Sequence, residues 1–441
     1  KLSQSEFVNV FANIFEKTPA KNRGTIMSSH PAEAVAANIE LVARLDIAGG
    51  GQVVVQDDLA FVGHMDAPHG TTIIDVSTPS HPKIIKEIKL EDTLSHTHKV
   101  RVAGNLMITN VEQAQRHLLR RGAALPTVIA ELEKSLKRSP SEEEIAKVLD
   151  IPVYKLDDVR TFLKNGYHEG GFRVWDISDP ANPELLSYVK THGFGVHRFD
   201  MDENYAYIST EMEGYIGNIL VIYDLADPRN PVEVSRWHMP GQHIAGGETP
   251  GWTGYKNRLH HALRVGDELW AAVWNAGFRI IDISDITQPK TIGAHNYHPP
   301  FPEPTHTALP CRQRFDGRRI AVVMDEEHQH QPGRLHAFMW LFDVTDLDNI
   351  HAVSAFDVSE MDSPWSRAGG RFGAHQFREK LDDTMVYATW FSGGLRVIDI
   401  ANPSQPQEIA HYIPPPPPGF PSPQSNDVDV DENGFMYLLD R

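Results

Sequence analysis

The chain has 441 residues, a formal net charge of -18 and a single cysteine, Cys311. An acidic chain lacks the basic footprint of a nucleic-acid-binding protein, and one cysteine excludes both an internal disulfide framework and a thiolate zinc cluster. No apolar run approaches the ~18 residues of a membrane-spanning helix. We therefore expect neither a nucleic-acid nor a membrane partner, and any metal must have imidazole and oxygen ligands.

The N-terminal segment carries no recognisable chemistry. Its apolar residues between Phe7 and Phe15 are spaced as on a helix, so residues 1–37 are predicted as a short helix and an extended arm. No signal peptide is visible, which favours a cytoplasmic location. The chain begins at Lys1 rather than Met, so export with a removed signal stays an alternative.

A repeated motif organises most of the remaining chain. Its clearest copy, residues 170–183, reads Gly-Gly-Phe-Arg-Val-Trp-Asp-Ile-Ser-Asp-Pro-Ala-Asn-Pro. The short run of β-branched and aromatic residues predicts a strand buried on both faces, and the Asp, Ser and Pro residues predict a turn after it. The six copies place the motif Asp at Asp75, Asp176, Asp224, Asp282, Asp343 and Asp399.

The spacing of the copies predicts the fold class. From Asp176 onward the motif recurs at intervals of about 50 to 60 residues, the length of a four-stranded blade with its loops. Six full copies and one blade divided between the two chain ends predict an all-β, seven-bladed β-propeller over residues 38–441.

Residues 112–169 interrupt this pattern and are predicted to be helical. Ser139-Pro140-Ser141-Glu142 offers an N-cap, a proline at the first helical position and a capping-box glutamate. The block resembles a sigma-factor helix-turn-helix, but its acidic setting disfavours DNA binding. We expect a helical insertion in the second blade that acts as a lid over one face of the propeller or as the contact of a homo-oligomer.

Five histidines share one position at the start of the predicted innermost strands. They are His98, His197, His261, His306 and His375. Innermost strands line the central channel of a propeller, so residues at a matched position form a ring around its axis. A lone histidine there would ordinarily only hydrogen-bond a neighbouring blade, whereas five at one register predict a bound transition metal ion. Iron or copper is favoured, with zinc and manganese as alternatives.

Further polar and aromatic residues lie at the ends of predicted second strands, on the same face as the histidines. The candidate proton-transfer groups are His64, Asp66 and Glu327. The candidate substrate-pocket residues are Trp274, Trp390 and Phe391, for which core packing is an equal alternative. Long loops on this face and short turns on the other favour it as the functional face.

The two chain ends are predicted to complete one sheet. Residues 38–47 alternate apolar and polar side chains as an outermost strand does, and residues 426–430 and 435–439 are predicted as two inner strands. Pairing between them would leave no sheet edge open. This sheet still lacks a third strand, which suggests a native chain that continues past Arg441.

The repeat Val-Ile-Asp-Ile-Ser-Asp-Pro, together with the axial histidines, resembles the LVIVD-repeat propellers over nearly the whole chain. The resemblance implies the propeller fold. The chain is more distantly similar to selenium-binding protein/methanethiol oxidase, a copper-linked propeller, and the related carotenoid oxygenases hold iron with four axial histidines. No cysteine lies near the histidines of this chain, which argues against thiol chemistry.

Three classes of function fit these residues. The favoured class is a metal-dependent oxidoreductase that acts on a small, largely apolar organic molecule. The second is a Lewis-acid lyase or hydrolase, in which Asp66, His64 or Glu327 moves the proton. The third is a non-catalytic propeller that offers one face to a protein partner.

Overall fold

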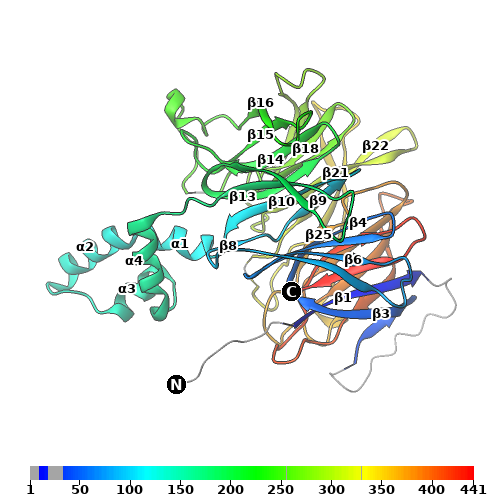
Figure 1. Ribbon diagram of the computed structural model, residues 1–441, viewed down its shortest axis with the longest axis horizontal. Helices are drawn as coiled ribbons and strands as arrows, with labels where there is room; N and C mark the ends of the chain where they lie inside the picture. The colour runs from blue at the N-terminus through cyan, green and yellow to red at the C-terminus, as the bar shows by residue number, and fades with distance from the viewer. Residues whose placement is uncertain (1–8, 18–32, 255, 329) are drawn as a thin grey trace.

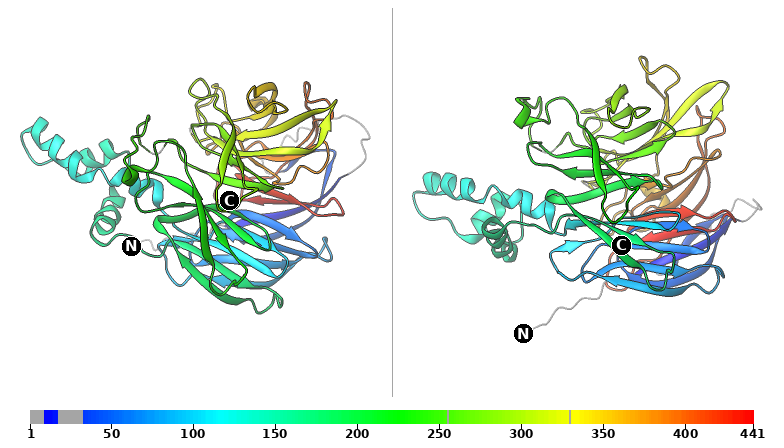
Figure 2. Two further views of the ribbon diagram at one scale, coloured as in Figure 1. Left: turned by 90° about the horizontal axis from the view of Figure 1, so that it is seen from above. Right: turned by 45° about the horizontal axis from the view of Figure 1, so that its top comes forward.

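The computed structural model describes residues 9–17, 33–254, 256–328 and 330–441. Their strands form six antiparallel sheets that are arranged around a common axis in the manner of a propeller (Figures 1 and 2). The prediction of an all-β, propeller-like fold is therefore confirmed. Within the described part of the chain, no helix is both long enough and apolar enough to cross a membrane.

Four sheets are built from strands that follow one another in sequence. The first contains β4 (Gly50–Gln56), β5 (Leu59–His64), β6 (His69–Asp75) and β7 (Lys83–Lys89). The second contains β17 (His261–Val265), β18 (Glu268–Ala272), β19 (Phe278–Asp282) and β20 (Lys290–His295). The third contains β21 (Thr305–Phe315), β22 (Arg318–Asp325), β23 (Met339–Asp343) and β24 (His351–Phe356). The fourth contains β25 (Ala374–Phe377), β26 (Met385–Trp390), β27 (Gly394–Asp399) and β28 (Gln407–Ile413), and β2 (Val35–Ala37) pairs with β28 at its edge.

A fifth sheet joins nine strands. They are β8 (Ser95–His96), β9 (Val100–Ala103), β10 (Leu106–Gln113), β11 (Gly171–Asp176), β12 (Glu184–Lys190), β13 (His192–Met201), β14 (Tyr205–Glu211), β15 (Asn218–Asp224) and β16 (Val232–Trp237). Its two halves, β8–β12 and β13–β16, are connected through the pairing of Glu112 in β10 with Gly195 in β13.

The motif Asp is the last residue of a strand in every copy of the repeat, at the ends of β6, β11, β15, β19, β23 and β27. Its carboxylate accepts a hydrogen bond of 2.7 to 2.9 Å from the backbone N–H two residues later. This contact holds the chain in a turn toward the next strand. The strand before it is buried on both faces, as β15 shows with every residue but its last buried.

Apolar side chains fill the space between neighbouring sheets. Trp270 of β18, Phe278 of β19 and Phe342 of β23 are fully buried in one cluster that joins two sheets. Burial of each such side chain stabilises the fold by roughly 1.5–3 kcal/mol before entropy is counted. These clusters fix the sheets relative to one another and so provide a rigid frame around the axis.

The two ends of the chain share the sixth sheet, whose order is β29 (Ser425–Val430), β30 (Met436–Asp440), β1 (Asn9–Lys17) and β3 (Ile39–Ala48). The helix expected between Phe7 and Phe15 is wrong where the structure describes it, because residues 9–17 form a strand between β30 and β3. Two open strand edges offer this segment more hydrogen bonds than an isolated helix would have. The third place in the sheet, which the sequence left empty, is filled by β1.

Four α-helices lie between β10 and β11. They are α1 (Arg116–Gly122), α2 (Leu125–Leu136), α3 (Glu142–Leu149) and α4 (Leu156–Asn165). Short 3-10 turns occur at η1 (Val153–Lys155), η2 (Ile244–Gly246) and η3 (Glu360–Asp362). The N-cap of α3 is Ser141 rather than the predicted Ser139, and Glu144 completes the capping box. With this start, a glutamate falls at the third helical position, from which its side chain reaches back to the cap.

Candidate metal centre

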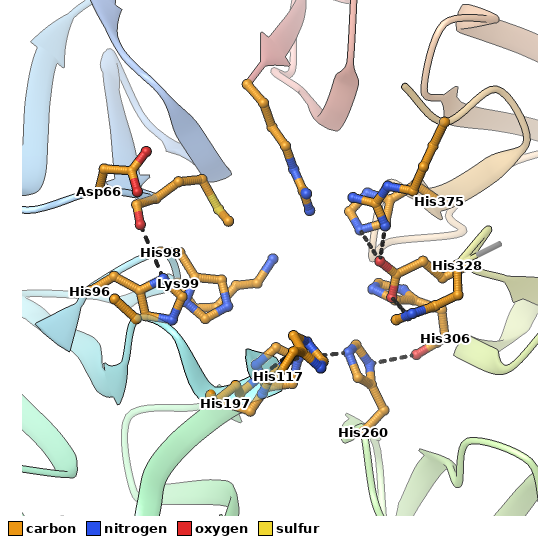
Figure 3. Close-up of a pocket in the computed structure, with 16 residues that line it drawn as sticks. Asp66, His96, His98, Lys99, His117, His197, His260, His306, His328 and His375 are labelled. Carbon is orange, nitrogen blue, oxygen red and sulfur yellow. Dashed lines mark hydrogen bonds and ion pairs between the residues drawn. The ribbon is translucent and has the colours of Figure 1, made fainter. Parts of the chain in front are cut away.

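A cavity of about 380 Å³ lies between the innermost strands and is lined mostly by polar side chains (Figure 3). Eight histidines line it: His96, His98, His117, His197, His260, His306, His328 and His375. Its other ionisable residues are Asp66, Lys99, Arg116, Glu326, Arg371 and Arg441. The propeller therefore concentrates imidazole, carboxylate and guanidinium groups at one place on its axis.

A β-bulge in the innermost strands presents the histidines to this cavity. The registers of β13, β21 and β25 each skip one residue, so that His197, His306 and His375 have no partner on the neighbouring strand. The same irregularity falls at Gly51 in β4 and at Asn426 in β29. A bulged residue leaves the hydrogen-bonding ladder, and the bulge re-aims its side chain.

His260, directly before the strand β17, supplies the corresponding imidazole. Its backbone N–H donates to the carbonyl of Ala272 at 2.8 Å, while the next residue, His261, pairs with Ala272 in the regular ladder. The Nε2 atoms of His260 and His197 are 3.0 Å apart. The ring centroids of His260 and His306 are separated by 4.2 Å. Imidazoles at three innermost strands thus approach one another directly.

Two sets of residues bring three ligand atoms within 4.8 Å of one another at or beside this cavity. One set is His96, His98 and Glu112, and the other is His260, His306 and Glu326. Nitrogen and oxygen ligands lie ~2.0–2.2 Å from a bound zinc ion. Small side-chain rotations would bring either set to a common cation, so the donor atoms fit a metal ion.

The buried histidines are held in the neutral form. Burial lowers the pKa well below its ordinary value for His98, His197, His260, His306 and His375. Neutral imidazole is the form that binds a metal. The fold therefore sets the protonation state that metal binding requires, without a proton having to leave first.

Glu326 is the carboxylate at the centre of this cavity. Burial opposes its ionisation, but His328, His375 and Arg371 together hold the pKa of Glu326 well below its usual range. The Nη1 atom of Arg371 donates to its Oε1 at 2.8 Å. The site thus places one fixed negative charge beside several neutral imidazoles.

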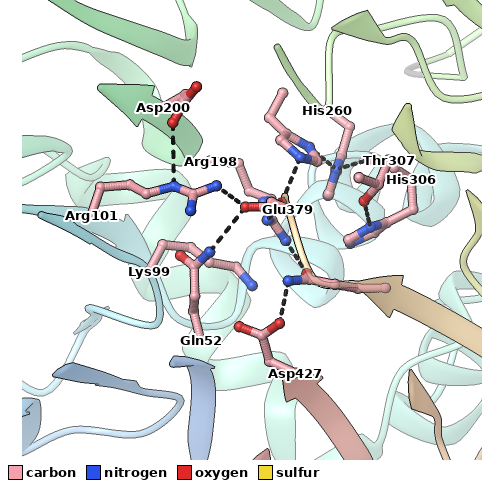
Figure 4. Close-up of polar contacts among 12 residues, drawn as sticks. Gln52, Lys99, Arg101, Arg198, Asp200, His260, His306, Thr307, Glu379 and Asp427 are labelled. Atoms are coloured by element: carbon pink, nitrogen blue, oxygen red, sulfur yellow. Dashed lines mark hydrogen bonds and ion pairs between the residues drawn. The ribbon is translucent and has the colours of Figure 1, made fainter. Parts of the chain in front are cut away.

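His261, predicted as a ring member, does not line the cavity. Its Nε2 is 2.9 Å from Oε1 of Glu379, in a buried ionic cluster adjacent to the histidines (Figure 4). Glu379 also forms ion pairs with Arg101 and Arg198 and accepts a hydrogen bond of 3.4 Å from Gln52. The prediction fails by one residue because His261 is regularly paired in β17, and the residue before it takes the ring position.

A family model described as the LVIVD repeat matches five segments of the chain, residues 50–89, 166–191, 200–238, 266–296 and 385–413. The chain is an LVIVD-repeat protein. Each matched segment contains one motif Asp at a strand end, whereas the copy at Asp343 lies outside the matches. No curated protein matches the chain.

Solved structures that resemble this LVIVD-repeat protein do so at very low sequence identity. Chaetomium thermophilum Raptor has a TM-score of 0.50 at 8% identity, over 89% of this chain and 28% of that chain. A structure of the mitotic checkpoint complex has a TM-score of 0.49 at 7% identity, over 96% and 98% of the two chains. The computationally designed Ika8 protein has a TM-score of 0.45 at 7% identity, over 89% and 96%. At these identities the likeness concerns the fold alone.

Of the three predicted proton-transfer groups in this LVIVD-repeat protein, only Asp66 lines the cavity. His64 is buried in its own sheet with Nε2 2.7 Å from the Thr72 hydroxyl, and burial lowers its pKa to about 4. Glu327 contacts a different group of histidines outside the cavity. Successive residues of an extended chain point to opposite sides. Because the Glu326 side chain points toward the axis, the Glu327 side chain points away from it.

None of the three predicted aromatic residues lines the cavity either. Trp390 and Phe391 are fully buried, and the Phe391 ring lies 4.8 Å from the ring of His375. Trp274 packs against His260 at 5.1 Å between ring centroids. These rings support the imidazoles from behind, which is the core-packing alternative, and the cavity itself has no aromatic wall.

Several cavity residues were not predicted from the sequence. They are His96, Lys99, Arg116, His117, His260, Arg371 and Arg441. Two signals could have found part of this set. His96 precedes His98 by two residues, the spacing that places two side chains on one face of an extended chain. His260 stands directly beside His261, so the sequence offered two choices for one position.

The helices cover the cavity only through α1, which contributes Arg116 and His117. The other three helices extend away from the sheets (Figures 1 and 2). Their buried apolar residues, among them Val128, Ile145 and Val159, pack mainly on one another. The predicted lid is therefore limited to α1, because the helical block has a small core of its own.

Proposed function

We propose that this protein is a metal-dependent enzyme in which a transition metal ion binds at the axial histidines and a small molecule reacts beside it. The observation that carries the proposal is the 3.0 Å separation between the Nε2 atoms of His197 and His260. Two buried nitrogen atoms at this distance share either one proton or one cation. His306 and Glu326 lie close enough to His260 to form a ligand set with it.

The donor set favours iron or copper. Imidazole nitrogen suits both metals, and a site with several histidines and one carboxylate is typical of non-haem iron and of copper centres. Zinc and manganese are the alternatives. A bound iron or copper ion would supply redox or oxygen chemistry, so oxidoreductase activity is the preferred class. The resemblance to selenium-binding protein that we expected from the sequence points to the same class.

The charged groups of the cavity favour a polar substrate over the apolar one expected from the sequence. Arg116, Arg371, Arg441 and Lys99 line the cavity together with the imidazoles. Guanidinium groups bind carboxylates and other planar anions through paired hydrogen bonds. We therefore propose a small organic molecule with an anionic group as the substrate, oriented by these side chains.

A Lewis-acid lyase or hydrolase is the second candidate. Asp66 and His328 line the cavity and offer a carboxylate and an imidazole for proton transfer. Such groups beside a metal ion are the requirement for activating water or polarising an oxygen. The non-catalytic alternative is not favoured, because the polar groups converge inside a cavity rather than on an exposed apolar patch.

We also propose a number of blades and a division of the chain into parts. If the halves of the nine-stranded sheet are separate blades, the propeller has seven, with α1–α4 inserted in the second. The propeller then includes β1 and β2, which the sequence pattern placed in a separate N-terminal helix and arm, together with residues 38–441, and residues 112–169 are its insertion. A cytoplasmic location and a homo-oligomer contact through the insertion stay predictions.

Elemental analysis of protein purified without added metal tests the proposal. We expect iron or copper that is lost in the His306→Ala and His375→Ala variants, while these variants keep the circular dichroism of the wild type. An electron spin resonance signal would favour redox chemistry over Lewis-acid chemistry. A metal content that is near zero, or that neither substitution changes, would overturn the proposal.

A further inference from the structure

A second group of metal-ligating side chains lies outside the axial cavity, in the segment that follows β22. The Nδ1 atom of His330 is 2.8 Å from Oε1 of Glu327, and the Nδ1 atom of His336 is 2.9 Å from Oε2 of the same carboxylate. The two imidazole rings are stacked at 5.4 Å between centroids. One carboxylate thus lies between two histidine nitrogens, and none of the three residues lines the axial cavity.

Neighbouring groups hold this cluster in place. The Nε2 atom of His336 is 2.8 Å from Oε1 of Glu360, which also accepts a hydrogen bond of 2.6 Å from the backbone N–H of Gly333. Arg367 donates to the other oxygen of Glu360 at 2.5 Å. A metal-bound histidine typically donates its second ring N–H to such a carboxylate, which fixes the tautomer. Glu360 thus fixes the proton on Nε2 of His336, and a cation bound at Nδ1 would replace the proton that now lies between Nδ1 and Glu327.

The position of the Glu327 carboxylate depends on the absence of a side chain at Gly373. A Cβ at residue 373 would lie 1.9 Å from Oε2 of Glu327. Glu327 is fully buried and His336 is 7% exposed. The fold therefore leaves space for this carboxylate in the interior of the protein, and Glu327 is not an ordinary surface charge.

The geometry is close to that of a bound ion. The three ligand atoms lie within 4.8 Å of one another. Around a tetrahedral zinc ion with bonds of ~2.1 Å, neighbouring ligand atoms are roughly 3.4 Å apart. The two contacts from histidine to Glu327, at 2.8 and 2.9 Å, need to open by only about half an ångström to meet this requirement.

We propose that Glu327, His330 and His336 form a second binding site, specific for a divalent transition ion of the zinc class, with a fourth position left for water. The ion would tie together the segment between β22 and β23. That segment begins with Glu326 and carries His328, both of which line the axial cavity. The second ion would thereby hold two side chains of the first site in position.

The test uses the His260→Ala variant in a His98→Ala background, in which each axial ligand set lacks one member, so that it does not depend on the proposed function. All variants of this test carry His98→Ala as well. After removal of metal with a chelator, the protein is titrated with Zn²⁺ by calorimetry. We expect this variant to bind one equivalent and the His260→Ala/His336→Ala and His260→Ala/His330→Ala variants to lose at least tenfold in affinity. His260→Ala/His351→Ala is the matched control, because His351 is an exposed histidine of the same sheet that contacts only the carbonyl of Asn349, and it should bind as His260→Ala does.

Cobalt provides a second measurement that does not depend on stoichiometry. Co²⁺ added to the His260→Ala variant should give visible absorption bands that disappear with His336→Ala. A folded His260→Ala variant that binds no Zn²⁺ would overturn the second site, as would binding that His330→Ala and His336→Ala leave unchanged. Failure of the axial proposal looks different: the wild type would then lose no metal on substitution of His260 but would lose it on substitution of His336.

Discussion

The Nε2 atoms of His197 and His260 lie 3.0 Å apart, although His197 lies in β13 and His260 directly precedes β17 of another sheet. Neither ring can take up a proton easily, because burial lowers the pKa of both well below its ordinary value. Each neutral ring still carries one N–H, so the contact holds either one such proton or, as we propose, a metal ion in its place. The adjacent pair His260 and His261 allows this interpretation to be tested by neighbouring substitutions.

We predict that His260→Ala reduces the affinity of the axial site for its metal at least tenfold, since even the loss of an outer-shell partner typically costs 10–100-fold. His261→Ala should lower the metal content less, because His261 does not line the cavity and touches only the far nitrogen of the His260 ring, at 3.0 Å between the Nδ1 atoms. Elemental analysis of both purified variants is the measurement. Equal metal loss in the two variants would contradict the assignment of the ring position to His260.

We predict that Glu379→Gln destabilises the fold by about 3–5 kcal/mol, because it leaves buried cations without their counter-charge. Glu379 is the common partner of Arg101, Arg198 and His261. Urea unfolding measures the change. The double variant Arg198→Met/Glu379→Leu should recover part of the loss, and a Glu379→Gln protein as stable as the wild type would show that the cluster contributes little.

The turns that end the repeats should make stability sensitive to acid. Hydrogen bonds from the Ser178 hydroxyl and backbone N–H lower the pKa of Asp176 in the folded state. A carboxyl group whose folded pKa is depressed stabilises the fold above its unfolded pKa, ~3.9, and loses this contribution as the pH falls through the folded pKa. Asp176→Asn should therefore be less stable than the wild type at pH 7 and equally stable at pH 2, by thermal unfolding.

Ser178→Ala is the matched control for this prediction. It removes the side-chain hydrogen bond to Asp176 and keeps the backbone one, so a smaller loss at pH 7 is expected. A difference between Asp176→Asn and wild type that is the same at both pH values would show that the effect does not come from ionisation.

Deleting the residues before Ala48 should lower the melting temperature sharply. The deletion removes β1 and nearly all of β3 and leaves β29 and β30 as a two-stranded sheet with an open edge. Two strands alone are marginally stable in water. Adding a synthetic peptide of residues 9–48 should restore part of the lost stability. A truncated protein that melts like the full chain would contradict closure through β1.

The helical block should unfold without loss of the axial metal. Val159 is fully buried in the core that the helices share, so Val159→Asp places a charge where no partner compensates it. We expect reduced helical circular dichroism and an unchanged metal content. Concurrent loss of metal would indicate that α2–α4 support the cavity, as the predicted lid would require.

The repeat made the fold predictable, because each motif Asp ends a buried strand and begins a turn. Long-range pairing was harder to predict. The strand β1 takes its conformation from the open edges of β30 and β3, which lie at opposite ends of the sequence. The spacing of apolar residues such as Phe11 and Ile14 carries no information about these partner strands, so the sequence pattern alone favoured a helix.

The sequence predicted that histidines surround the axis, but at one strand it selected the wrong one of two adjacent histidines. His98, His197, His306 and His375 do line one cavity. The choice between His260 and His261 depends on where the strand begins its regular pairing with Ala272, which a single sequence does not reveal. Whether Arg116 and His117 reach the cavity depends on the path of α1. Which of Glu326 and Glu327 reaches it depends on the side of the chain to which each side chain points.

At the bulges of the innermost strands, the type of the axial residue has little effect on the hydrogen bonds that hold the sheet together. Because the bulged residue has no partner in the ladder, Gly51 and Asn426 occupy in β4 and β29 the place that histidine occupies in β13, β21 and β25. Exchange among the positions that carry a side chain leaves the backbone pairing on either side intact, whereas at Gly51 a Cβ would collide with the carbonyl oxygen of His98. The same scaffold can accordingly acquire, lose or replace ligands one strand at a time, which makes its chemistry easier to alter than its fold.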